Sequence, residues 1–287
     1  MKKVLLIISD YKEGAKKLAH KISDFLRERG FEAISFHYDG YDGLNMDKEV
    51  LTQDFSFVIS LGGDGNVLFA SRFAAPKGIP VFPINFGQFG FIANIEPENW
   101  KTELKKFLDG KQESHMRMLL RVQVIRKSQC IADYNALNEA AVSNNGLAKL
   151  NSIDLFYKQF SFGTFRSDGI IVASPIGSTG YAVAAGGPIL DPSMLAFVVL
   201  PIAPFTLSSR PLVLPAEGEL KLEILPQRQK QLILSVDGQE SVQLETGDAV
   251  LISQSKTRVN LIGCSQEHFY KVLRAKLGWS GTFTMNG

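Results

Sequence analysis

Hydrophobic and polar positions follow two different periods in the first third of the chain. Residues 4–8 form a continuous apolar run, which is typical of a strand covered on both faces. Between residues 15 and 29 apolar side chains recur at helical spacing, with lysines and arginines opposite, and Gly30 then ends the helix. The same reasoning predicts strands at 33–36, 57–61 and 80–84 and helices at 66–75 and 98–108. Strands that alternate with helices predict a parallel sheet with helical cover.

Beyond about Ser114 the pattern changes to short β-branched or aromatic runs separated by Gly, Pro and Asn. These runs predict strands at residues 122–125, 153–156, 170–173, 197–200, 220–224, 232–236 and 250–252. Such a succession favours a β-sandwich. Residues 266–277 return to helical spacing, and we expect them to pack back on the first domain. The expected organisation is an α/β domain with a parallel sheet over residues 1–114, a mostly-β, sandwich-like domain over 115–264, and a tail over 265–287.

Composition narrows the class of protein. A chain of 287 residues is long enough for two domains, and a net charge of +2 argues against a nucleic-acid partner. Cys130 and Cys264 lie far apart and outside any metal-ligand spacing, so neither a disulfide framework nor a zinc site is expected. The longest apolar stretch, residues 194–207, contains Pro201 and Pro204 and falls short of the roughly 20 residues of a membrane span. We therefore expect a cytoplasmic protein with no membrane partner.

Several common motifs are missing from the sequence. There is no Walker-type GxxxxGK[ST] segment. The best match to the dinucleotide fingerprint GxGxxG begins at Gly63 but has Leu68 where the third glycine belongs, and residues 177–180 do not fit the GxSxG nucleophile motif. The four histidines show no metal-ligand spacing. The missing fingerprint glycine disfavours an NAD-dependent oxidoreductase.

A glycine-rich turn joins the strand predicted at 57–61 to the helix that follows it. Its glycines, Gly62, Gly63 and Gly65, are expected to permit positive φ angles and the close approach of a ligand, and amides of the turn and the helix N-terminus would bind phosphate. Asp64 would repel phosphates unless it abstracts a proton from a hydroxyl or acts through a divalent cation. The alternative is a plain turn in which Asp64 caps the helix. Both interpretations stay open on this motif alone.

Two further segments contain groups that could bind a nucleotide. Residues 174–188 (SPIGSTGYAVAAGGP) combine glycines with small hydroxyl side chains that could donate to a ligand, and Tyr181 offers a flat face for a base. Asn138 and Glu139 precede an apolar run, and a carboxylate that accepts from two vicinal hydroxyls is a common way to hold a ribose. Taken by itself, the pair is better explained as an exposed strand end.

In combination these segments resemble the NAD kinase family. The resemblance rests on residues 62–65, the Asn138-Glu139 pair and residues 174–188, in that order, and it extends to residues 85–92 (NFGQFGFI). The glycine-aspartate turn alone is also similar to lipid kinases and phosphofructokinases, whereas the Asn-Glu pair and the Gly-Ser-Thr segment are more specific. The similarity runs over nearly the whole chain, from Leu5 to about Gln239.

The resemblance implies transfer of a phosphoryl group from ATP, or a related donor, to the adenosine 2′-hydroxyl of NAD. It implies that Asp64 is the base for the hydroxyl proton, that Mg²⁺ is the cation, with its protein ligands unassigned, and that the chain forms a homodimer or homotetramer. The residues implied to bind NAD are Asp64, Gly65, Asn138, Glu139, Lys149, Arg166, Asp168, Thr179, Gly180, Tyr181, Ala182, Val183, Ala184 and Gln239.

Three positions depart from the family pattern. Ile176 stands where the family often has Thr, Gly180 where Ala is usual, and Asn66 where Thr is common. The first two differences keep apolar filling or small size. We interpret Asn66 as a variant of the helix cap, which leaves the metal arrangement undefined.

Two alternatives from other classes stay open. A lipid or sphingoid kinase would share the glycine-aspartate turn and the two-domain plan, but it needs an apolar entrance for an acyl chain. The Asn138-Glu139 pair favours an acceptor that carries a ribose. A non-catalytic dinucleotide sensor would use Asp64 only as a cap and would bind NADP without turnover.

Overall fold

The computed structural model describes residues 1–40, 46, 48–87, 90–145, 150–226 and 232–278. These residues form two units. The first unit takes residues 1–40, 46–116 and the C-terminal part from Val259, and the described part of the second unit lies within residues 117–258. The sequence predicts divisions at 114/115 and 264/265. In the structure they fall at 116/117 and 258/259. Strands β5 (Ser114–Arg126) and β16 (Ala249–Ile262) contribute residues to both units.

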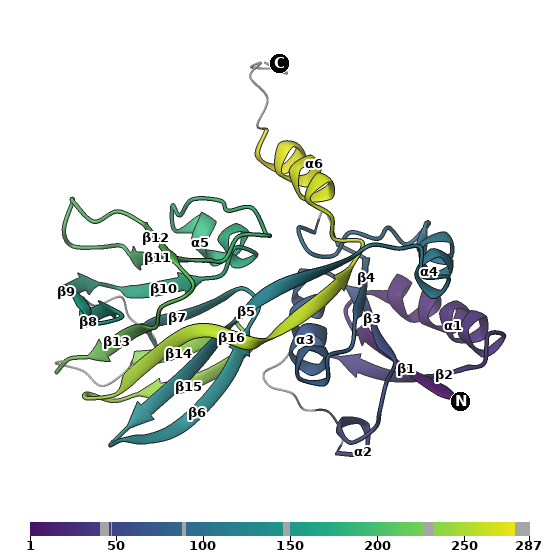
Figure 1. Cartoon of the computed structure of the whole chain (residues 1–287), viewed down its shortest axis with the longest axis horizontal. Helices are drawn as coiled ribbons and strands as arrows, with labels where there is room; N and C mark the ends of the chain where they lie inside the picture. Colours follow the sequence, from purple (N-terminus) through teal and green to yellow (C-terminus); the bar gives the residue numbers. More distant parts are fainter. Residues whose placement is uncertain (41–45, 47, 88–89, 146–149, 227–231, 279–287) are drawn as a thin grey trace. The chain divides into compact units, whose positions relative to one another are not determined.

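The first unit is built on a parallel sheet with helical cover (Figure 1). Its parallel strands are, in sheet order, β2 (Phe31–Tyr38), β1 (Lys2–Ser9), β3 (Phe57–Gly62) and β4 (Val81–Asn85). Leu261 near the end of β16 then pairs in parallel with Val81. The helices are α1 (Glu13–Arg27), α2 (Lys48–Leu51), α3 (Asp64–Ala74), the 3-10 turn η1 (Ala75–Lys77), α4 (Trp100–Leu108) and α6 (Gln266–Leu277). Each strand and helix predicted for residues 4–108 is present, with ends that differ by at most two residues.

The core of this unit explains why the elements form where they do. Strands β1 and β3 are buried along most of their length. The apolar face of α1 shares one hydrophobic cluster with these strands and with α4; it consists of Ala15, Leu18, Ala19, Ile22, Phe25 and Leu26. Because the carboxyl ends of parallel strands lie at one edge of a sheet, the loops after β3 and β4 are neighbours there, and the Phe86 N–H donates to the Gly62 carbonyl at 2.8 Å.

The second unit is a sandwich of antiparallel sheets. One sheet has the order β12-β11-β10-β7-β14-β15, and the other contains β16-β13-β8-β9 with β5 and β6. Strands of both sheets supply the same core cluster. The remaining bounds are β6 (Gln129–Ala136), β7 (Glu139–Asn144), β8 (Asn151–Tyr157), β9 (Phe160–Ser167), β10 (Gly169–Ala173), η2 (Gly177–Thr179), α5 (Tyr181–Ala184), β11 (Ala196–Ile202), β12 (Leu212–Pro215), β13 (Leu220–Ile224), β14 (Leu232–Val236) and β15 (Glu240–Leu244). The predicted fold class, an α/β domain followed by a mostly-β sandwich, is confirmed.

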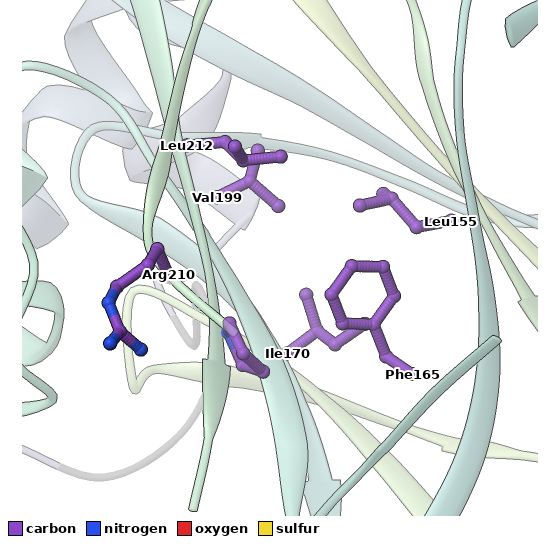
Figure 2. Close-up of a pocket in the computed structure, with 7 residues that line it drawn as sticks. Leu155, Phe165, Ile170, Val199, Arg210 and Leu212 are labelled. Carbon is purple, nitrogen blue, oxygen red and sulfur yellow. The ribbon is translucent and has the colours of Figure 1, made fainter. Parts of the chain in front are cut away.

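The two sheets of the sandwich meet closely. Figure 2 shows Leu155 and Phe165 of one sheet pointing toward Ile170, Val199 and Leu212 of the other. The pocket they line has a volume of about 10 Å³, room for about one water molecule. This part of the interior is therefore packed core and offers no space for a nucleotide.

Helix α6 belongs to the first unit. Its cap is Ser265, whose Oγ accepts from the His268 N–H at 3.2 Å. The side chains of Phe269, Val272 and Leu273 are buried, and the Phe269 ring lies 5.9 Å from the Phe91 ring. Within the described residues, no helix has both the length and the apolar character needed to cross a membrane.

Candidate active site

The glycine-aspartate turn lies at the carboxyl end of β3, where α3 begins. Gly63 precedes the helix with φ −94° and ψ −168°, and no side chain caps the helix. None of the three glycines of the turn has a positive φ, so that expectation was wrong. Gly62 is required for space, because a Cβ there would lie 2.6 Å from the Asn66 Cβ. At Gly63 and Gly65 a Cβ would meet nothing within 4 Å, which leaves the backbone open to a ligand.

Asn66 is not a helix cap, which corrects our interpretation of this departure. Its side chain is 4% exposed, and its Nδ2 donates to the Ile7 carbonyl at 2.9 Å and to the Ser60 Oγ at 3.0 Å. The amide therefore ties the first turn of α3 to strands β1 and β3. It fixes the position of the glycine-aspartate turn at the sheet edge.

The carboxylate of Asp64 anchors the loop that follows β4. Its Oδ2 accepts from the Phe91 N–H at 2.9 Å, and its Oδ1 accepts from the Ile92 and Ala93 N–H groups at 3.2 and 2.9 Å. Gly90 makes this possible, because a Cβ there would lie 2.5 Å from the Asp64 Oδ1. Asp64 is partly exposed, and a carboxylate has about four acceptor positions. With three main-chain donors bound, one position is left for a substrate hydroxyl.

The segment that follows β16 also contacts the loop of residues 91–93. The Cys264 Sγ donates to the Ile92 carbonyl at 3.1 Å, and the Lys276 ammonium lies 4.4 Å from the centre of the Phe91 ring. Burial lowers the pKa of His268 on α6, while the Gly90 carbonyl and the Asp64 charge oppose the shift. The loop held by Asp64 is therefore also in contact with residues of the segment that follows β16.

A shallow pocket of about 210 Å³ is lined in part by the residue that follows β4. Phe86, whose N–H binds the Gly62 carbonyl, is one of its lining residues, and the others are Gly14, Lys17, Leu18, Lys21, Pro97 and Glu98. Two lysines and one glutamate leave it with a positive balance of formal charge, which favours an anionic ligand.

The described residues contain no group of three or more His, Cys, Asp or Glu side chains that could hold a metal ion. The Asp64 carboxylate already accepts from three N–H groups. In that part of the chain no protein cage for a cation is therefore present. Mg²⁺ commonly binds through one or two carboxylates together with substrate phosphates, and only that kind of site fits these residues.

In the second unit, Asn138 and Glu139 form a pair of buried acceptors at the start of β7. Glu139 is 9% exposed, so the interpretation as an exposed strand end was wrong. The Asn138 Oδ1 and the Glu139 Oε2 are buried and have no hydrogen-bond partner. Because a buried polar atom without a partner costs about 1–3 kcal/mol, two adjacent ones indicate a ligand that brings hydrogen-bond donors.

The Glu139 carboxyl has a strongly altered acidity. Burial, and next the negative charge of Asp237, raise its pKa to about 8, while the Tyr181 N–H acts in the opposite direction. At pH 7 the carboxyl of the ligand-free protein is therefore mostly protonated. A perturbed group with a named cause, next to acceptors without partners, marks a functional site.

The Gly-Ser-Thr segment packs directly on this pair. The Ser174 N–H donates to the Asn138 carbonyl at 2.8 Å, and a Cβ at Gly177 would lie 2.0 Å from the same oxygen. A Cβ at Gly180 would lie 3.0 Å from the Glu139 Oε2 and 3.2 Å from the Asn138 Nδ2. The glycines are thus needed to bring this segment up to the acceptor pair.

The hydroxyl groups of the segment have a structural role. The Ser174 Oγ donates to the Leu137 carbonyl, the Ser178 Oγ to the Pro175 carbonyl and the Thr179 Oγ1 to the Ile176 carbonyl. In the ligand-free chain their protons hold the backbone of the loop in place, and the assignment of Thr179 to NAD stays a prediction.

The other predicted NAD residues of this segment fall into two groups. Tyr181 is 44% exposed, and Val183 and Ala184 have at least partial exposure. Ala182 is fully buried in a core cluster with residues of β10 and β11, so its side chain belongs to the core. Gln239 is 7% exposed and follows Asp237 and Gly238 in the chain. Gln239 was predicted as a site residue, whereas Asp237 was not.

Asp168 lies just before β10, at the end of that strand far from the partner of Glu139, and Arg166 lies on β9 of the other sheet. Strand β10 pairs with β7 so that Ala173 is opposite Glu139 and Gly169 is opposite Ser143. At about 3.3 Å per residue, this places Asp168 roughly 15 Å along the strand from the acceptor pair. Their assignment to NAD stays a prediction, and Lys149 lies outside the described residues. Asp64 and Gly65 belong to the first unit.

Comparison with known protein families identifies both units. The ATP-NAD kinase N-terminal domain matches residues 4–112, and the ATP-NAD kinase C-terminal domain matches residues 137–264. These matches cover the glycine-aspartate turn and the acceptor pair. The chain therefore has the architecture of a two-domain phosphotransferase.

Individual relatives agree over the whole length. The chain is 54% identical to an NAD kinase of Treponema denticola over 98% of both chains, and 43% identical to one of Treponema pallidum over 98% of this chain and 90% of the relative. A solved NAD kinase of Archaeoglobus fulgidus in complex with ATP is 29% identical, with a TM-score of 0.76 over 98% of this chain and all of the other. Yeast NADH kinase complexed with NADH shares the fold, with 19% identity and a TM-score of 0.87 over 100% of this chain and 90% of the other. The chain belongs to the NAD kinase family.

Proposed function

We propose that this chain is an NAD kinase that transfers a phosphoryl group from ATP to the adenosine 2′-hydroxyl of NAD. The observation that carries the proposal is the pair of buried acceptors, Asn138 Oδ1 and Glu139 Oε2, which lack a partner in a chain of this family. Vicinal ribose hydroxyls are donors that match two adjacent acceptors, and NAD has two riboses, so the pair can be satisfied without the proton that Asp64 accepts. Diacylglycerol, which has a single free hydroxyl, would leave at least one of the two atoms unsatisfied.

Asp64 is proposed to accept the proton of the 2′-hydroxyl. A ribose hydroxyl is a poor nucleophile at neutral pH, and a positioned carboxylate contributes about 10²–10⁴-fold by removing its proton in the transition state. The amides of Phe91, Ile92 and Ala93 hold the carboxylate in one orientation. This orientation leaves one acceptor position for the substrate and avoids reorganisation during the reaction.

The remaining catalytic effect is proposed to come from alignment and charge. The open backbone at Gly63 and Gly65 lets phosphate oxygens approach main-chain N–H groups at the start of α3. Mg²⁺, carried on the donor phosphates, would neutralise part of their charge. Asn138 and Glu139 orient the acceptor so that one hydroxyl faces the donor.

The test is a direct transfer assay on the purified chain. The protein is incubated with Mg²⁺, radiolabelled ATP and either NAD or diacylglycerol, and the products are separated and identified. Label in NADP alone is the expected result. Label in the lipid would favour a lipid kinase, and tight binding of NADP without any transfer would favour a dinucleotide sensor.

We also propose that the enzyme is cytoplasmic. We propose further that it forms a homodimer or homotetramer. Arg166 and Asp168 belong to the proposed NAD-binding set although Arg166 lies on β9 and Asp168 just before β10, beyond the end of β10 that is far from Glu139 in the same chain. Sedimentation velocity with and without NAD would measure the assembly state. Substitution of Arg166 by Met should raise the Michaelis constant for NAD, and an unchanged constant would remove Arg166 from the set.

A further inference from the structure

The turn between β14 and β15 has a backbone that only a few residue types favour. Asp237 and Gly238 have φ angles of 53° and 64°, and the Gln239 N–H donates to the Val236 carbonyl at 3.0 Å. Two left-handed residues closed by such a bond are typical of a type I′ turn, in which Asn-Gly and Asp-Gly are preferred. Either Asp or Asn can therefore occupy position 237 without strain.

The side chain of Asp237 holds the segment that leads into β7. It is 5% exposed. Its Oδ2 accepts from the Leu137 N–H at 2.8 Å, and its Oδ1 accepts from the Asn138 and Glu139 N–H groups at 2.7 and 3.1 Å. Its own N–H donates to the Glu139 carbonyl at 2.9 Å. Three consecutive N–H groups directed at one carboxylate form an anion nest, which fixes the direction in which the Asn138 and Glu139 side chains leave the backbone.

The same carboxylate acts on the charge of Glu139. After burial, the negative charge of Asp237 is the second cause of the raised pKa, and the Tyr181 N–H on α5 opposes both. The strand residues nearest in register, Ala173 on β10 opposite Glu139 and Val236 on β14 opposite the next residue, carry no charge. Asp237 is thus the charged side chain that adds to the effect of burial on the titration of this carboxyl.

We propose that Asp237 is a positioning residue for the dinucleotide, which holds the Asn138 and Glu139 side chains as a preformed pair of acceptors and couples ligand binding to the loss of one proton. The Glu139 carboxyl loses its O–H proton to water or buffer, and the ligand hydroxyls donate to the carboxylate that remains; no other covalent bond changes. The inference rests on the proposed function only because it takes NAD as the ligand.

The first experiment needs no ligand. The side-chain carboxyls are titrated by NMR in protein labelled with ¹³C-glutamate, and Glu139→Gln assigns the signal. The wild type should show a midpoint of about 8 for Glu139, and Asp237→Asn, which preserves the turn, should lower it by about one pH unit because a nearby like charge is removed. An unchanged midpoint in Asp237→Asn would overturn the inference.

Asp248→Asn is the matched control. Asp248 is another buried carboxylate, 1% exposed, but it accepts from the Arg126 guanidinium and from the Glu245 N–H. None of the contacts described for residues 137–139 involves it. We expect this variant to lose stability and to keep the Glu139 midpoint.

The second experiment measures NAD binding by calorimetry between pH 6 and 8.5 in buffers of different ionisation enthalpy. The wild-type affinity should rise by up to about tenfold per pH unit below pH 8, with close to one proton released at pH 7. In Asp237→Asn the rise should move to lower pH, and at pH 8.5 the affinity should be at least about tenfold weaker because the acceptors are no longer held. An affinity within twofold of the wild type and an unshifted profile would overturn the inference.

Two outcomes distinguish a failure of this inference from a failure of the proposed function and from unfolding of the variant. If the wild type neither binds nor phosphorylates NAD, the proposed function fails, while the ligand-free titration still decides the effect of Asp237. If melting curves show that Asp237→Asn is unfolded, the wild type and Glu139→Gln are compared instead. The wild-type affinity must then depend on pH and that of Glu139→Gln must not, and a flat wild-type profile would overturn the inference.

Discussion

Each unit contains one carboxylate that accepts from three consecutive backbone N–H groups, but the two arrangements expose different atoms. Asp64 in the first unit binds residues 91–93 and is itself partly exposed. Asp237 in the second unit binds residues 137–139 and is 5% exposed. The Asp64 carboxylate itself is available to a substrate. The Asp237 carboxylate is buried, and the side chains of the segment that it holds are available to a ligand instead. The same local structure therefore suits chemistry in one place and binding in the other.

The largest effect is expected from Asp64→Asn. An amide cannot accept the hydroxyl proton, so kcat should fall by about 10²–10⁴-fold, while the dissociation constant for NAD should change little. Steady-state kinetics and calorimetry on the same preparation measure the two quantities. A kcat within a few-fold of the wild type would remove Asp64 from the base role. A parallel loss of NAD affinity would instead assign it the same kind of role as Asp237.

The next largest effect is expected from Gly177→Ala. The added methyl would lie 2.0 Å from the Asn138 carbonyl oxygen, and such overpacking costs about 1–3 kcal/mol or more. NAD affinity should fall by about 10–100-fold, together with the melting temperature. Gly63→Ala is the matched control for stability, because its Cβ would meet nothing within 4 Å, and it should melt near the wild-type temperature. Wild-type affinity in Gly177→Ala would show that the acceptor pair does not depend on this contact.

Glu139→Gln should weaken NAD binding by an amount that depends on pH. A hydrogen bond to a charged acceptor is worth about 1.5–3 kcal/mol, so the loss should be about 10–100-fold at pH 8.5. At pH 6 it should be only a few-fold, because the wild-type carboxyl, with a pKa of about 8, is then mostly neutral. Titrations at the two pH values measure this difference. Equal losses at both would contradict the raised pKa.

As pH rises, Glu139→Gln should lose NAD affinity relative to the wild type but gain stability relative to it. The pKa of Glu139 rises from 4.5 to about 8 on folding, so the unfolded chain loses its proton first as pH increases. The free energy of unfolding of the wild type, relative to Glu139→Gln, should therefore be highest below pH 4.5, fall between about pH 5 and 8, and stay level above. Urea denaturation across this range would show it, and a constant difference would contradict it.

The smallest effect is expected from Tyr181→Ala. Stacking of a base on an aromatic ring is worth about 1–3 kcal/mol, and Tyr181 is 44% exposed, which favours the lower limit. The Michaelis constant for NAD should rise about fivefold with kcat unchanged. A fall in kcat alone would place Tyr181 near the transferred group, on the Asp64 side of the comparison.

The sequence predicted many of the elements whose side chains follow one period, although it missed β7 and β15, which also do. Helix α1 and strand β1 have continuous buried faces and were predicted within two residues. Strand β9 was missed because its burial alternates irregularly, with exposed residues at its start. The second half of β16 was missed for a similar reason, since buried and exposed residues mix there.

The site was predictable as a set of residues but not as a set of contacts. The turn of Asp64 and the Asn138-Glu139 pair were found from residue type and order. The donors that bind Asp64 come 27 to 29 residues later in the chain, and Asp237 lies 98 to 100 residues after the segment that it holds. Contacts over such separations leave no local periodicity, so the partners of these carboxylates could not be predicted from the sequence.

The division of the first unit along the chain has a consequence for its synthesis. Leu261 pairs with Val81, and Cys264 and Phe269 contact residues 91 and 92. A growing chain releases these residues only after the entire second unit has left the ribosome. During that interval Val81 lacks its partner on β16 and the Phe91 ring lacks its contact with Phe269, while the end of β4 is already bonded to Ile95. A strand edge that is only partly paired is open to wrong association. The last 20 or so described residues therefore complete a structure that the first residues begin, and a nascent chain that stops at residue 258 would lack these contacts.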